Sequence, residues 1–203
     1  MNLDVDLFEK TKVDGKTRFR VWGPKGVSVV LGKSNVVDKE VLVKNCEKDK
    51  VGIFRRLGGG GTVLLCKGAA VISIAKKVDN GFDNLRYLRS INDIIIDCLQ
   101  GIGIKNLCQK GVSDICIGNR KVMGSSMYRS GDYLFYQGSL LVDMDIGKVH
   151  VYLRHPSKEP DYRNGRLHAE FLTTLSLEGY SFSVDWIVEN LGRSIDDNLR
   201  SVN

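Results

Sequence analysis

Short hydrophobic runs, separated by turn residues, are the main pattern along the chain. Runs rich in β-branched and aromatic residues that end at pairs such as Gly23-Pro24 or Ser130-Gly131 are typical of strands. Apolar positions recur at helical spacing from Phe82 to Leu99, before Gly101, and again after Ser183, a candidate N-cap. The predicted strands are residues 19–22, 27–32, 52–56, 62–65, 70–76, 104–108, 114–117, 121–127 and 133–142.

These elements predict an α+β fold, in which helices pack on one side of an antiparallel or mixed sheet. The 203 residues are enough for one domain with a substantial core. Because no repeat or linker divides the sequence, we expect a single domain over residues 1–203.

The stretch from Leu153 to Arg166 breaks this pattern. It contains two prolines, few apolar residues and four cations against two anions. A connection of this length in a compact domain is usually functional or disordered. We therefore predict a long exposed loop, with a plain solvated connection as the alternative.

Composition and charge limit the partners and the compartment. The first residues lack the basic start and apolar run of a secretory signal, and no apolar run approaches the length that spans a membrane. We therefore expect a cytoplasmic protein without a membrane partner. The formal net charge of +6 suits anionic partners such as a nucleotide, an acidic carrier domain or nucleic acid. Aromatic and basic residues are not interleaved in any one segment, which disfavours nucleic acid.

Cysteine and histidine usage points away from metals and structural disulfides. The five cysteines, at positions 46, 66, 98, 108 and 116, form an odd set without a Cys-x-x-Cys pair. The three histidines share no metal-ligand spacing. Cys66 stands beside Lys67, which could lower the pKa of its thiol, so Cys66 is the one cysteine kept as a candidate nucleophile.

The most informative stretch is Arg55 to Thr62, where two arginines run into four consecutive glycines between apolar runs. A strand-to-strand turn needs at most two glycines, so this loop indicates that something approaches the backbone closely. Glycine N–H groups and arginine side chains both suit phosphate or carboxylate. A P-loop needs Lys-Ser/Thr and then a helix after the glycines, and the dinucleotide fingerprint also needs a helix. Here the strand-like Thr62 to Leu65 follows instead.

Together with later blocks, this stretch resembles the lipoate-protein ligase family, whose signature is Arg-Arg-x-Ser-Gly-Gly-Gly-Ala-Val. Residues 29–40 resemble the first strand and turn of that family. Residues 113–115 and 121–126 resemble its Asn-Asp-Ile and Lys-Ile-Ser-Gly-Ser-Ala blocks, and residues 137–141 resemble its His-Gly-Thr-Leu-Leu. The resemblance covers most of the chain and implies the catalytic-domain fold of the biotin/lipoate ligases.

The resemblance also implies the chemistry. Lipoate or octanoate is adenylated with ATP and Mg²⁺ and is then transferred to a lysine of a lipoyl-domain acceptor protein. Lys121 is the implied catalytic cation, and Asp114 is the implied Mg²⁺ or phosphate-side carboxylate. The implied binding residues are Arg55, Arg56, Gly58, Gly59, Gly60, Gly61, Thr62, Val63, Asp114, Gly124, Ser125, Gln137 and Gly138. Val63, Leu65 and Val71 could line the slot for the acyl tail.

Some positions depart from the family pattern and leave two alternatives. Gln137 replaces a histidine, Ser113 replaces an asparagine, and the amino-terminal helix of the relatives is absent or reduced to Met1 to Lys10. By comparison with full-length ligases, we also expect no carboxyl-terminal accessory domain. One alternative is a carrier-dependent octanoyl transferase, which would need a cysteine nucleophile. The other is a non-catalytic partner that binds an acyl-adenylate. An accessory subunit could also be needed to form the adenylate.

Overall fold

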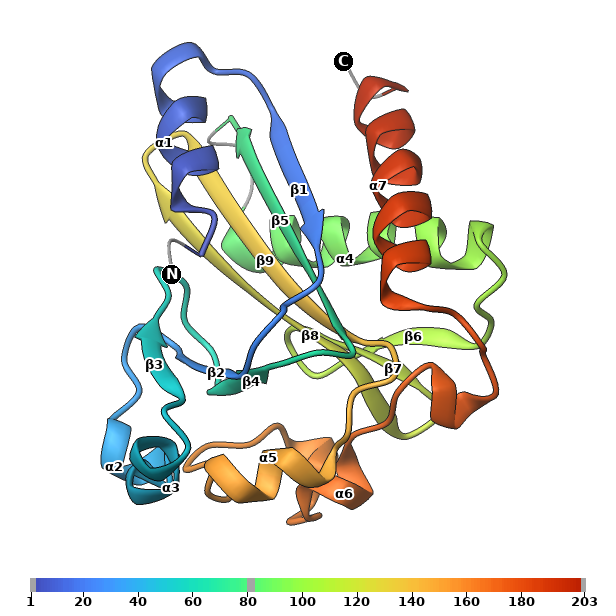
Figure 1. Cartoon of the computed structure of the whole chain (residues 1–203). Helices are drawn as coiled ribbons and strands as arrows, with labels where there is room; N and C mark the ends of the chain where they lie inside the picture. The colour runs from blue at the N-terminus through green and yellow to red at the C-terminus, as the bar shows by residue number, and fades with distance from the viewer. Residues whose placement is uncertain (1–2, 80–82, 202–203) are drawn as a thin grey trace.

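Two β-sheets form the frame of the molecule (Figure 1). The structure is a computed structural model, and it describes residues 3–79 and 83–201. The large sheet is antiparallel throughout, and its order is β1 (Arg18–Trp22), β5 (Ala69–Lys77), β9 (Tyr133–Leu141), β8 (Arg120–Ser130), β7 (Asp114–Ile117) and β6 (Leu107–Lys110). In the small sheet, β2 (Ser28–Leu31) lies between β3 (Gly52–Arg55), which is parallel to it, and β4 (Val63–Leu65), which is antiparallel.

Two long helices, α4 (Asn84–Gly101) and α7 (Val184–Ser201), cover one face of the large sheet. Strand alternation explains the main core, because Ile72 and Ile74 of β5 both point to these helices. Both helices begin at side-chain caps: the Asp83 carboxylate accepts from the backbone N–H of Arg86, and the Ser183 hydroxyl accepts from that of Trp186. The predicted cap at Ser183 is therefore confirmed.

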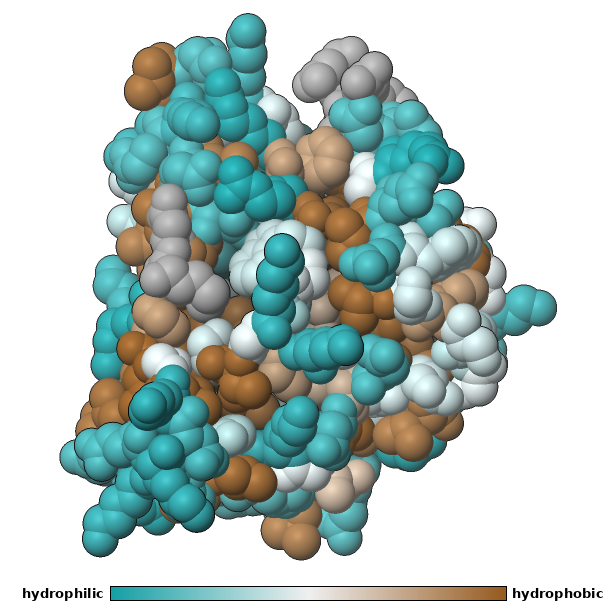
Figure 2. Space-filling view, in the orientation of Figure 1, coloured by the Kyte–Doolittle hydropathy of each residue, from teal (hydrophilic) through white to brown (hydrophobic). Residues whose placement is uncertain are grey.

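The opposite face of the large sheet meets α1 (Val5–Asp14), whose Leu7 and Phe8 pack on Ala75 and Phe135. The predicted α+β class with a mixed or antiparallel sheet is confirmed, and α1 adds a helix on this second face. In Figure 2, hydrophilic residues cover the outer surfaces of α1 and α7, and hydrophobic residues show between these helices. No helix among the described residues is both long and apolar enough to cross a membrane.

Three predicted boundaries need correction. The strand expected at 104–108 is β6 at Leu107–Lys110, because Ile104 follows the positive-φ turn at Gly103 and is buried in the core as the chain leaves α4. The helix expected to reach Leu99 continues through two more residues, and its last residue is Gly101, where the sequence predicted its end. The amino-terminal helix is not confined to the first ten residues, since α1 continues to Asp14. The expected helix start at Phe82 lies outside the described residues.

Short helices join the two sheets at the lower end of the molecule in Figure 1. The predicted loop at residues 153–166 contains only one helical turn, η1 (Asp161–Arg163), and most of its residues are exposed. Arg163 is an exception, because its side chain is buried. The other short elements are α2 (Val37–Glu40), α3 (Val43–Lys48), α5 (Gly147–Tyr152), α6 (His168–Phe171) and η2 (Ser176–Glu178).

Candidate active site

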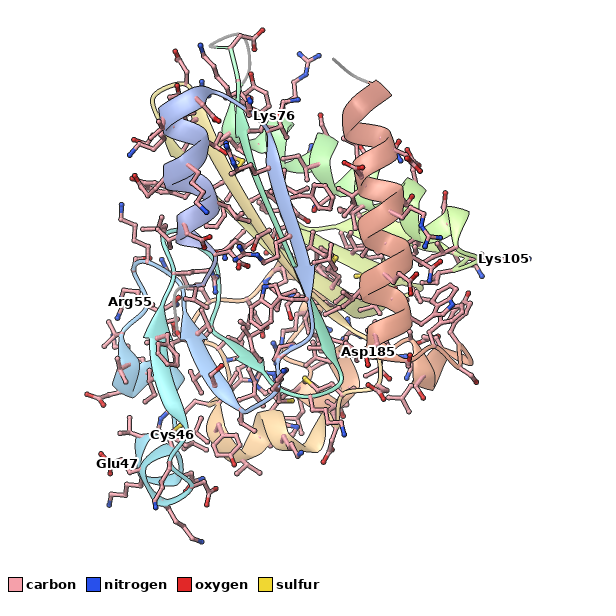
Figure 3. The ribbon with its side chains drawn as sticks, turned by 45° about the horizontal axis from the view of Figure 1, so that its top comes forward. Cys46, Glu47, Arg55, Lys76, Lys105 and Asp185 are labelled. Carbon is pink, nitrogen blue, oxygen red and sulfur yellow. The ribbon has the colours of Figure 1, made fainter. Side chains whose placement is uncertain are left out.

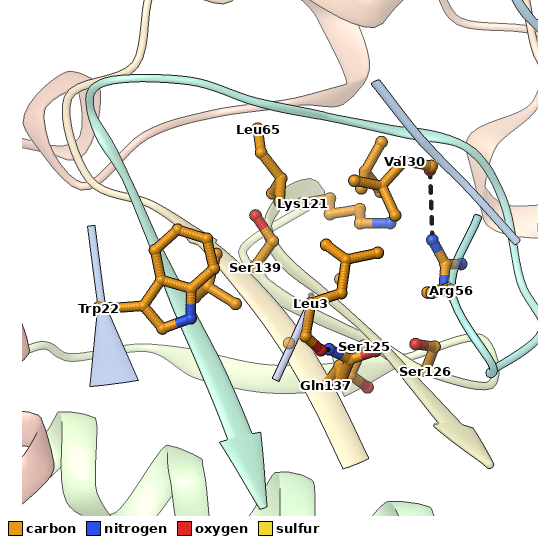
Figure 4. Close-up of a pocket in the computed structure, with 14 residues that line it drawn as sticks. Leu3, Trp22, Val30, Arg56, Leu65, Lys121, Ser125, Ser126, Gln137 and Ser139 are labelled. Carbon is orange, nitrogen blue, oxygen red and sulfur yellow. Dashed lines mark hydrogen bonds between the residues drawn. The ribbon is translucent and has the colours of Figure 1, made fainter. Parts of the chain in front are cut away.

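Two adjoining pockets lie where the small sheet meets the large one. The first, which we call the Trp22 pocket, encloses about 540 Å³ including space open to solvent, and Figure 4 shows Lys121 and Arg56 on its wall. The second, the His168 pocket, encloses about 610 Å³ on the same basis. Both share Val63, Lys121, Gly124 and Ser139, so Lys121 stands at their junction.

The Trp22 pocket is an apolar slot with a few polar groups. The predicted acyl-slot residues Val63, Leu65 and Val71 all line it. The sequence did not single out Leu3 or Trp22, which lie in the same lining. These two were missed because their positions depend on contacts with distant strands. Aliphatic and aromatic walls of this kind fit a hydrocarbon chain.

Arg56 is a buried cation that holds the glycine loop. Its Nη2 donates to the carbonyls of Gly59 and Gly61 at 2.6 and 2.7 Å, and its Nε donates to Gly59 at 3.2 Å. Burial lowers the pKa of Arg56 to about 10. Among the described residues no carboxylate forms an ion pair with it. A buried guanidinium that meets only carbonyl oxygens suits an anionic ligand in the pocket.

Arg55 has a structural position rather than the predicted ligand contact. Its Nη1 donates to the carbonyls of Gly32, Lys33 and Asn35 at 2.8 to 2.9 Å, which fixes the turn after β2. Its side chain lies at the edge of the small sheet and lines neither pocket (Figure 3). Neighbouring residues of a strand point in opposite directions, so only one of the two arginines can face the site.

The glycines shape the loop but do not line either pocket. Gly60 has φ +85°, and a Cβ there would lie 3.1 Å from Arg56 Nη2. A Cβ on Gly58 would lie 3.1 Å from Ser126 Oγ, whereas Gly59 and Gly61 have open space around them. The positive φ therefore favours glycine at position 60, and a larger residue at position 58 would crowd Ser126.

Thr62 follows the glycines and lines the His168 pocket. Its Oγ1 is buried and has no hydrogen-bond partner among the described residues. Because an unpartnered buried hydroxyl is costly, this atom indicates a polar ligand group in the pocket.

Lys121 projects from β8, where it pairs with Asp114 of β7. Lys121 Nζ lies 2.7 Å from Asp114 Oδ1, and the Tyr162 hydroxyl donates to Asp114 Oδ2 at 2.8 Å. Burial and the charge of Asp114 raise the pKa of Tyr162 well above its usual range, so this hydroxyl remains a proton donor. The pair holds the ammonium at the junction of the pockets.

Two glycines in the strands leave room for this arrangement. A Cβ on Gly124 would lie 2.7 Å from Lys121 Nζ, so glycine there provides the clearance that the sequence suggested. A Cβ on Gly138 would lie 2.2 Å from Met123 Cε, so that glycine allows β8 and β9 to pack beneath the Trp22 pocket. Any larger residue at Gly124 would displace the lysine.

Ser125 and Gln137 line the Trp22 pocket, but their polar groups are used elsewhere. The Ser125 hydroxyl lies 3.0 Å from Asn92 Oδ1, which also accepts from the Tyr136 hydroxyl at 2.8 Å. Gln137 Nε2 donates to the backbone carbonyl of Leu3 at 2.7 Å and so fixes the chain just before α1. Both side chains support the pocket wall.

Asp114 does not make the predicted Mg²⁺ site. Its two oxygens are already engaged by Lys121 and Tyr162, and neither pocket is lined by Asp114 or by any other described carboxylate. Among the described residues no group of three or more histidine, cysteine or acidic side chains is placed to hold a metal. Since Mg²⁺ prefers one or two carboxylates together with phosphate oxygens, the protein residues alone do not fit a dedicated ion. The position of Asp114 instead identifies it as the partner of Lys121.

The segment between α5 and α6 covers the His168 pocket. Arg163 is buried, and its guanidinium lies 4.6 Å from the centre of the Phe171 ring. Its Nη2 lies 3.4 Å from His168 Nδ1, and His168 Nε2 lies 3.0 Å from the carbonyl of Arg154. Because arginine only donates, Nδ1 accepts and the proton of neutral His168 is on Nε2. The sequence grouped Arg163 with exposed cations, since nothing local signals these distant contacts.

His168 should make the protein sensitive to acid. Burial lowers the pKa of His168 to about 4 from 6.5. Between these values the unfolded chain binds a proton that the folded chain does not, so the free energy of unfolding should fall as pH drops from about 6.5 to 4. In urea unfolding, the free energy of unfolding of His168→Gln should fall less over this pH range than that of wild type, by up to about 3 kcal/mol. Equal losses in this variant and in wild type would contradict the assignment.

The cysteines do not form a nucleophilic centre. Cys66 and Cys116 are buried, and burial raises the pKa of both thiols. The suggestion that Lys67 lowers the pKa of Cys66 is therefore wrong, because burial raises that pKa and the cation that opposes the shift is Lys148 rather than Lys67. Neither cysteine lines the two pockets.

Comparison with known proteins agrees with this geometry. A family model described as the lipoyl protein ligase A/B catalytic domain matches residues 1–195. The lipoate-protein ligase A of Psychrobacter cryohalolentis is 30% identical over 154 residues, which are 75% of this chain and 43% of that protein. The chain spans 37 to 44% of the length of the first curated relatives it matches. It therefore belongs to the lipoyl protein ligase A/B catalytic-domain family.

Solved structures show the same fold. A bi-partite lipoate protein ligase from Thermoplasma acidophilum, studied with its E2 lipoyl domain, superposes with a TM-score of 0.82 at 19% identity, over 98% of this chain and 77% of that one. A lipoate-protein ligase A bound with ATP gives a TM-score of 0.81 at 21% identity, over 98% and 78% of the two chains. At these identities the likeness establishes the fold.

Proposed function

We propose that this chain adenylates lipoate or octanoate with ATP and transfers the acyl group to a lysine of a lipoyl-domain protein. The observation that carries this proposal is the meeting of two cations, Arg56 and Lys121, on the wall of one apolar pocket. An acid with a hydrocarbon tail matches that combination, because the tail fits the slot and the carboxylate faces the cations. Family membership and the names of the relatives support the same substrate class.

In the proposed complex, the acyl tail lies along Val63, Leu65 and Val71, and its carboxylate lies near Lys121. The nucleotide occupies the His168 pocket, where Thr62 and Arg163 offer polar groups. A neighbour of the same fold is bound with ATP, which supports ATP as the nucleotide of the proposed complex. When the acyl oxygen attacks the α-phosphate, the bond from that phosphorus to the β-phosphate oxygen breaks and pyrophosphate leaves; negative charge builds at the α-phosphate, and the ammonium of Lys121 stabilises it. Mg²⁺ would enter as the counterion of the ATP phosphates.

The transfer step needs little from the protein beyond position. The ε-amine of the acceptor lysine attacks the carbonyl carbon of the mixed anhydride, the bond to AMP breaks, and the amine loses a proton. Because the acyl group is already activated, holding the two reactants together supplies most of the rate. The E2 lipoyl domain studied with the Thermoplasma ligase supports such an acceptor.

The direct test is to mix the chain with ATP, Mg²⁺ and either lipoate or octanoate, and to measure acyl-AMP and pyrophosphate. A lipoyl domain added afterwards should gain one acyl group on a single lysine by mass spectrometry. Tight binding of acyl-AMP without its formation would instead favour the non-catalytic partner. Formation only after a second protein is added would favour a bi-partite arrangement like that of the Thermoplasma ligase.

Replacing Cys66 with alanine should leave the transfer rate within about twofold of wild type, because the adenylate route needs no thiol. The buried position of Cys66, outside both pockets, gives the same expectation. Transfer rates of both proteins, measured with preformed acyl-AMP, would check it. An acyl-cysteine trapped by mass spectrometry, together with lost transfer, would favour the carrier-dependent octanoyl transferase.

A further inference from the structure

Strands β6 and β7 place two cysteines directly opposite each other. Their antiparallel register pairs Cys108 with Cys116, and both are free thiols. Opposite residues of an antiparallel pair have Cα atoms about 4.5 to 5.5 Å apart and side chains on the same face. A disulfide needs Cα atoms about 4.4 to 6.8 Å apart. The strand pair therefore already provides the spacing for a cross-strand disulfide.

Both thiols face the active site side of the sheet. Leu107 and Ile115, which alternate with them, belong to the core that includes α4. Asp114 shares the face of the cysteines, since it lies two residues before Cys116 on the same strand. Cys108 is half-buried and Cys116 is fully buried, so Cys108 is the thiol that a reagent in solution meets first.

Cys116 is the end of a hydrogen-bond series that reaches Lys121. Its Sγ lies 3.4 Å from the Tyr162 hydroxyl, which donates its proton to Asp114. Because the tyrosine proton is used there, the Cys116 S–H must be the donor to Tyr162. Asp114 in turn holds the ammonium of Lys121. The thiol proton thus helps to fix Tyr162 against β7.

We propose that Cys108 and Cys116 are a redox-sensitive pair, whose disulfide removes the thiol donor to Tyr162 and loosens the segment that covers the His168 pocket. Tyr162 belongs to η1 and stands beside Arg163, which lines that pocket. In the disulfide form Tyr162 retains Asp114 but loses its second partner. Only the effect on activity rests on the proposed function, because disulfide formation and loosening do not require it.

The oxidant is a low-molecular-weight disulfide such as oxidised glutathione. The Cys108 thiolate attacks one sulfur of that disulfide, and one glutathione thiolate leaves and takes up a proton. Cys116 then loses its proton and attacks Cys108 Sγ, which releases the second glutathione. Two protein thiols are oxidised and one glutathione disulfide is reduced to two thiols. Burial raises the pKa of Cys116 and so lowers its thiolate fraction, which leaves the first attack to the more accessible Cys108.

The test treats the native protein with oxidised glutathione, blocks remaining thiols and maps peptides by mass spectrometry. A linked Cys108–Cys116 peptide that dithiothreitol reverses is expected. Hydrogen exchange of residues 155–166 should become about fivefold faster, the factor that one lost hydrogen bond implies. The proposal is overturned if Cys108 retains glutathione without a linked peptide, or if the disulfide forms and exchange does not change.

Two variants separate the parts of the proposal. Cys108→Ser keeps the Cys116 contact with Tyr162, so its exchange should match reduced wild type and should not respond to the oxidant. Tyr162→Phe should still form the disulfide, but exchange of residues 155–166 should be fast before oxidation and unchanged after it. A response of Cys108→Ser to the oxidant, or a further increase in Tyr162→Phe, would contradict the mechanism.

The last measurement is the rate of acyl-AMP formation. Oxidised wild type should form acyl-AMP about fivefold more slowly than reduced wild type, by the same hydrogen-bond argument, whereas Cys108→Ser should be insensitive to oxidation. If neither protein forms acyl-AMP, the proposed function fails, and the linked peptide and the exchange data still decide whether the pair is redox-sensitive. An active enzyme whose rate is unaffected by the disulfide would refute the coupling to the site.

Discussion

Lys121→Ala should reduce acyl-adenylate formation by about a thousandfold, because it removes the cation nearest the developing negative charge. Lys121 lies at the junction of both pockets, and its ammonium is held there by Asp114. Release of pyrophosphate from ATP in the presence of lipoate or octanoate measures the loss. Lys77→Ala, at the exposed end of β5, is the matched control and should retain wild-type activity.

The single substitution also leaves Asp114 buried without its cation, which could destabilise the fold. The double variant Lys121→Ala with Asp114→Asn removes that charge and keeps an acceptor for Tyr162. It should melt close to wild type and remain inactive. Recovery of substantial adenylation in the double variant would mean that Lys121 only neutralises Asp114, and the proposed catalytic role would be rejected.

Gly60→Val should weaken binding of an acyl-adenylate by one to two orders of magnitude, because strain of about 1 to 3 kcal/mol at a positive φ makes the free loop relax out of the conformation that holds Arg56. Gly60 has φ +85°, and its added Cβ would contact Arg56 Nη2, so the buried guanidinium would also move. Isothermal titration with lipoyl-AMP or a non-hydrolysable mimic measures the change. Thermal stability should fall much less, because Gly60 is exposed.

Gly59→Val is the matched control for this prediction. A Cβ on Gly59 meets nothing within 4 Å, and its φ lies outside the left-handed region that favours glycine. The affinity of Gly59→Val for the acyl-adenylate should therefore remain within about threefold of wild type, because surface substitutions that touch no packed or strained position usually cost under about 0.5 kcal/mol. Similar losses in both variants would show that the loop contacts ligand along its whole length rather than through Arg56.

Local patterns identified most strands, both long helices and the glycine loop, because apolar periodicity and caps act over a few residues. The sequence could not assign different roles to Arg55 and Arg56, since that difference depends on which face of β3 meets the large sheet. The sequence pattern also placed Arg163 in an exposed loop. Its burial depends on Phe171 and His168, and nothing within the loop itself signals those contacts.

The role of Asp114 illustrates the same limit. Its family position suggested a metal ligand, but its carboxylate is engaged by Lys121 on the next strand and by Tyr162 from a distant segment. Leu3 and Trp22 were missed for a similar reason. They join the Trp22 pocket through long-range hydrogen bonds, from Gln137 to Leu3 and from Trp22 to Asp4. Such contacts carry no periodic signal in the sequence.

The two cations of the Trp22 pocket come from different sheets, and this affects the cohesion of the free protein. Arg56 follows β3 of the small sheet, whereas Lys121 belongs to β8 of the large sheet. Like charges on facing walls repel each other across an apolar pocket, while apolar contacts such as those among Val30, Leu65 and Val71 hold the sheets together. An anion bound between the cations attracts both of them, so the net electrostatic interaction across the pocket becomes favourable. Ligand binding therefore also couples the unfolding of the small sheet more closely to that of the large sheet.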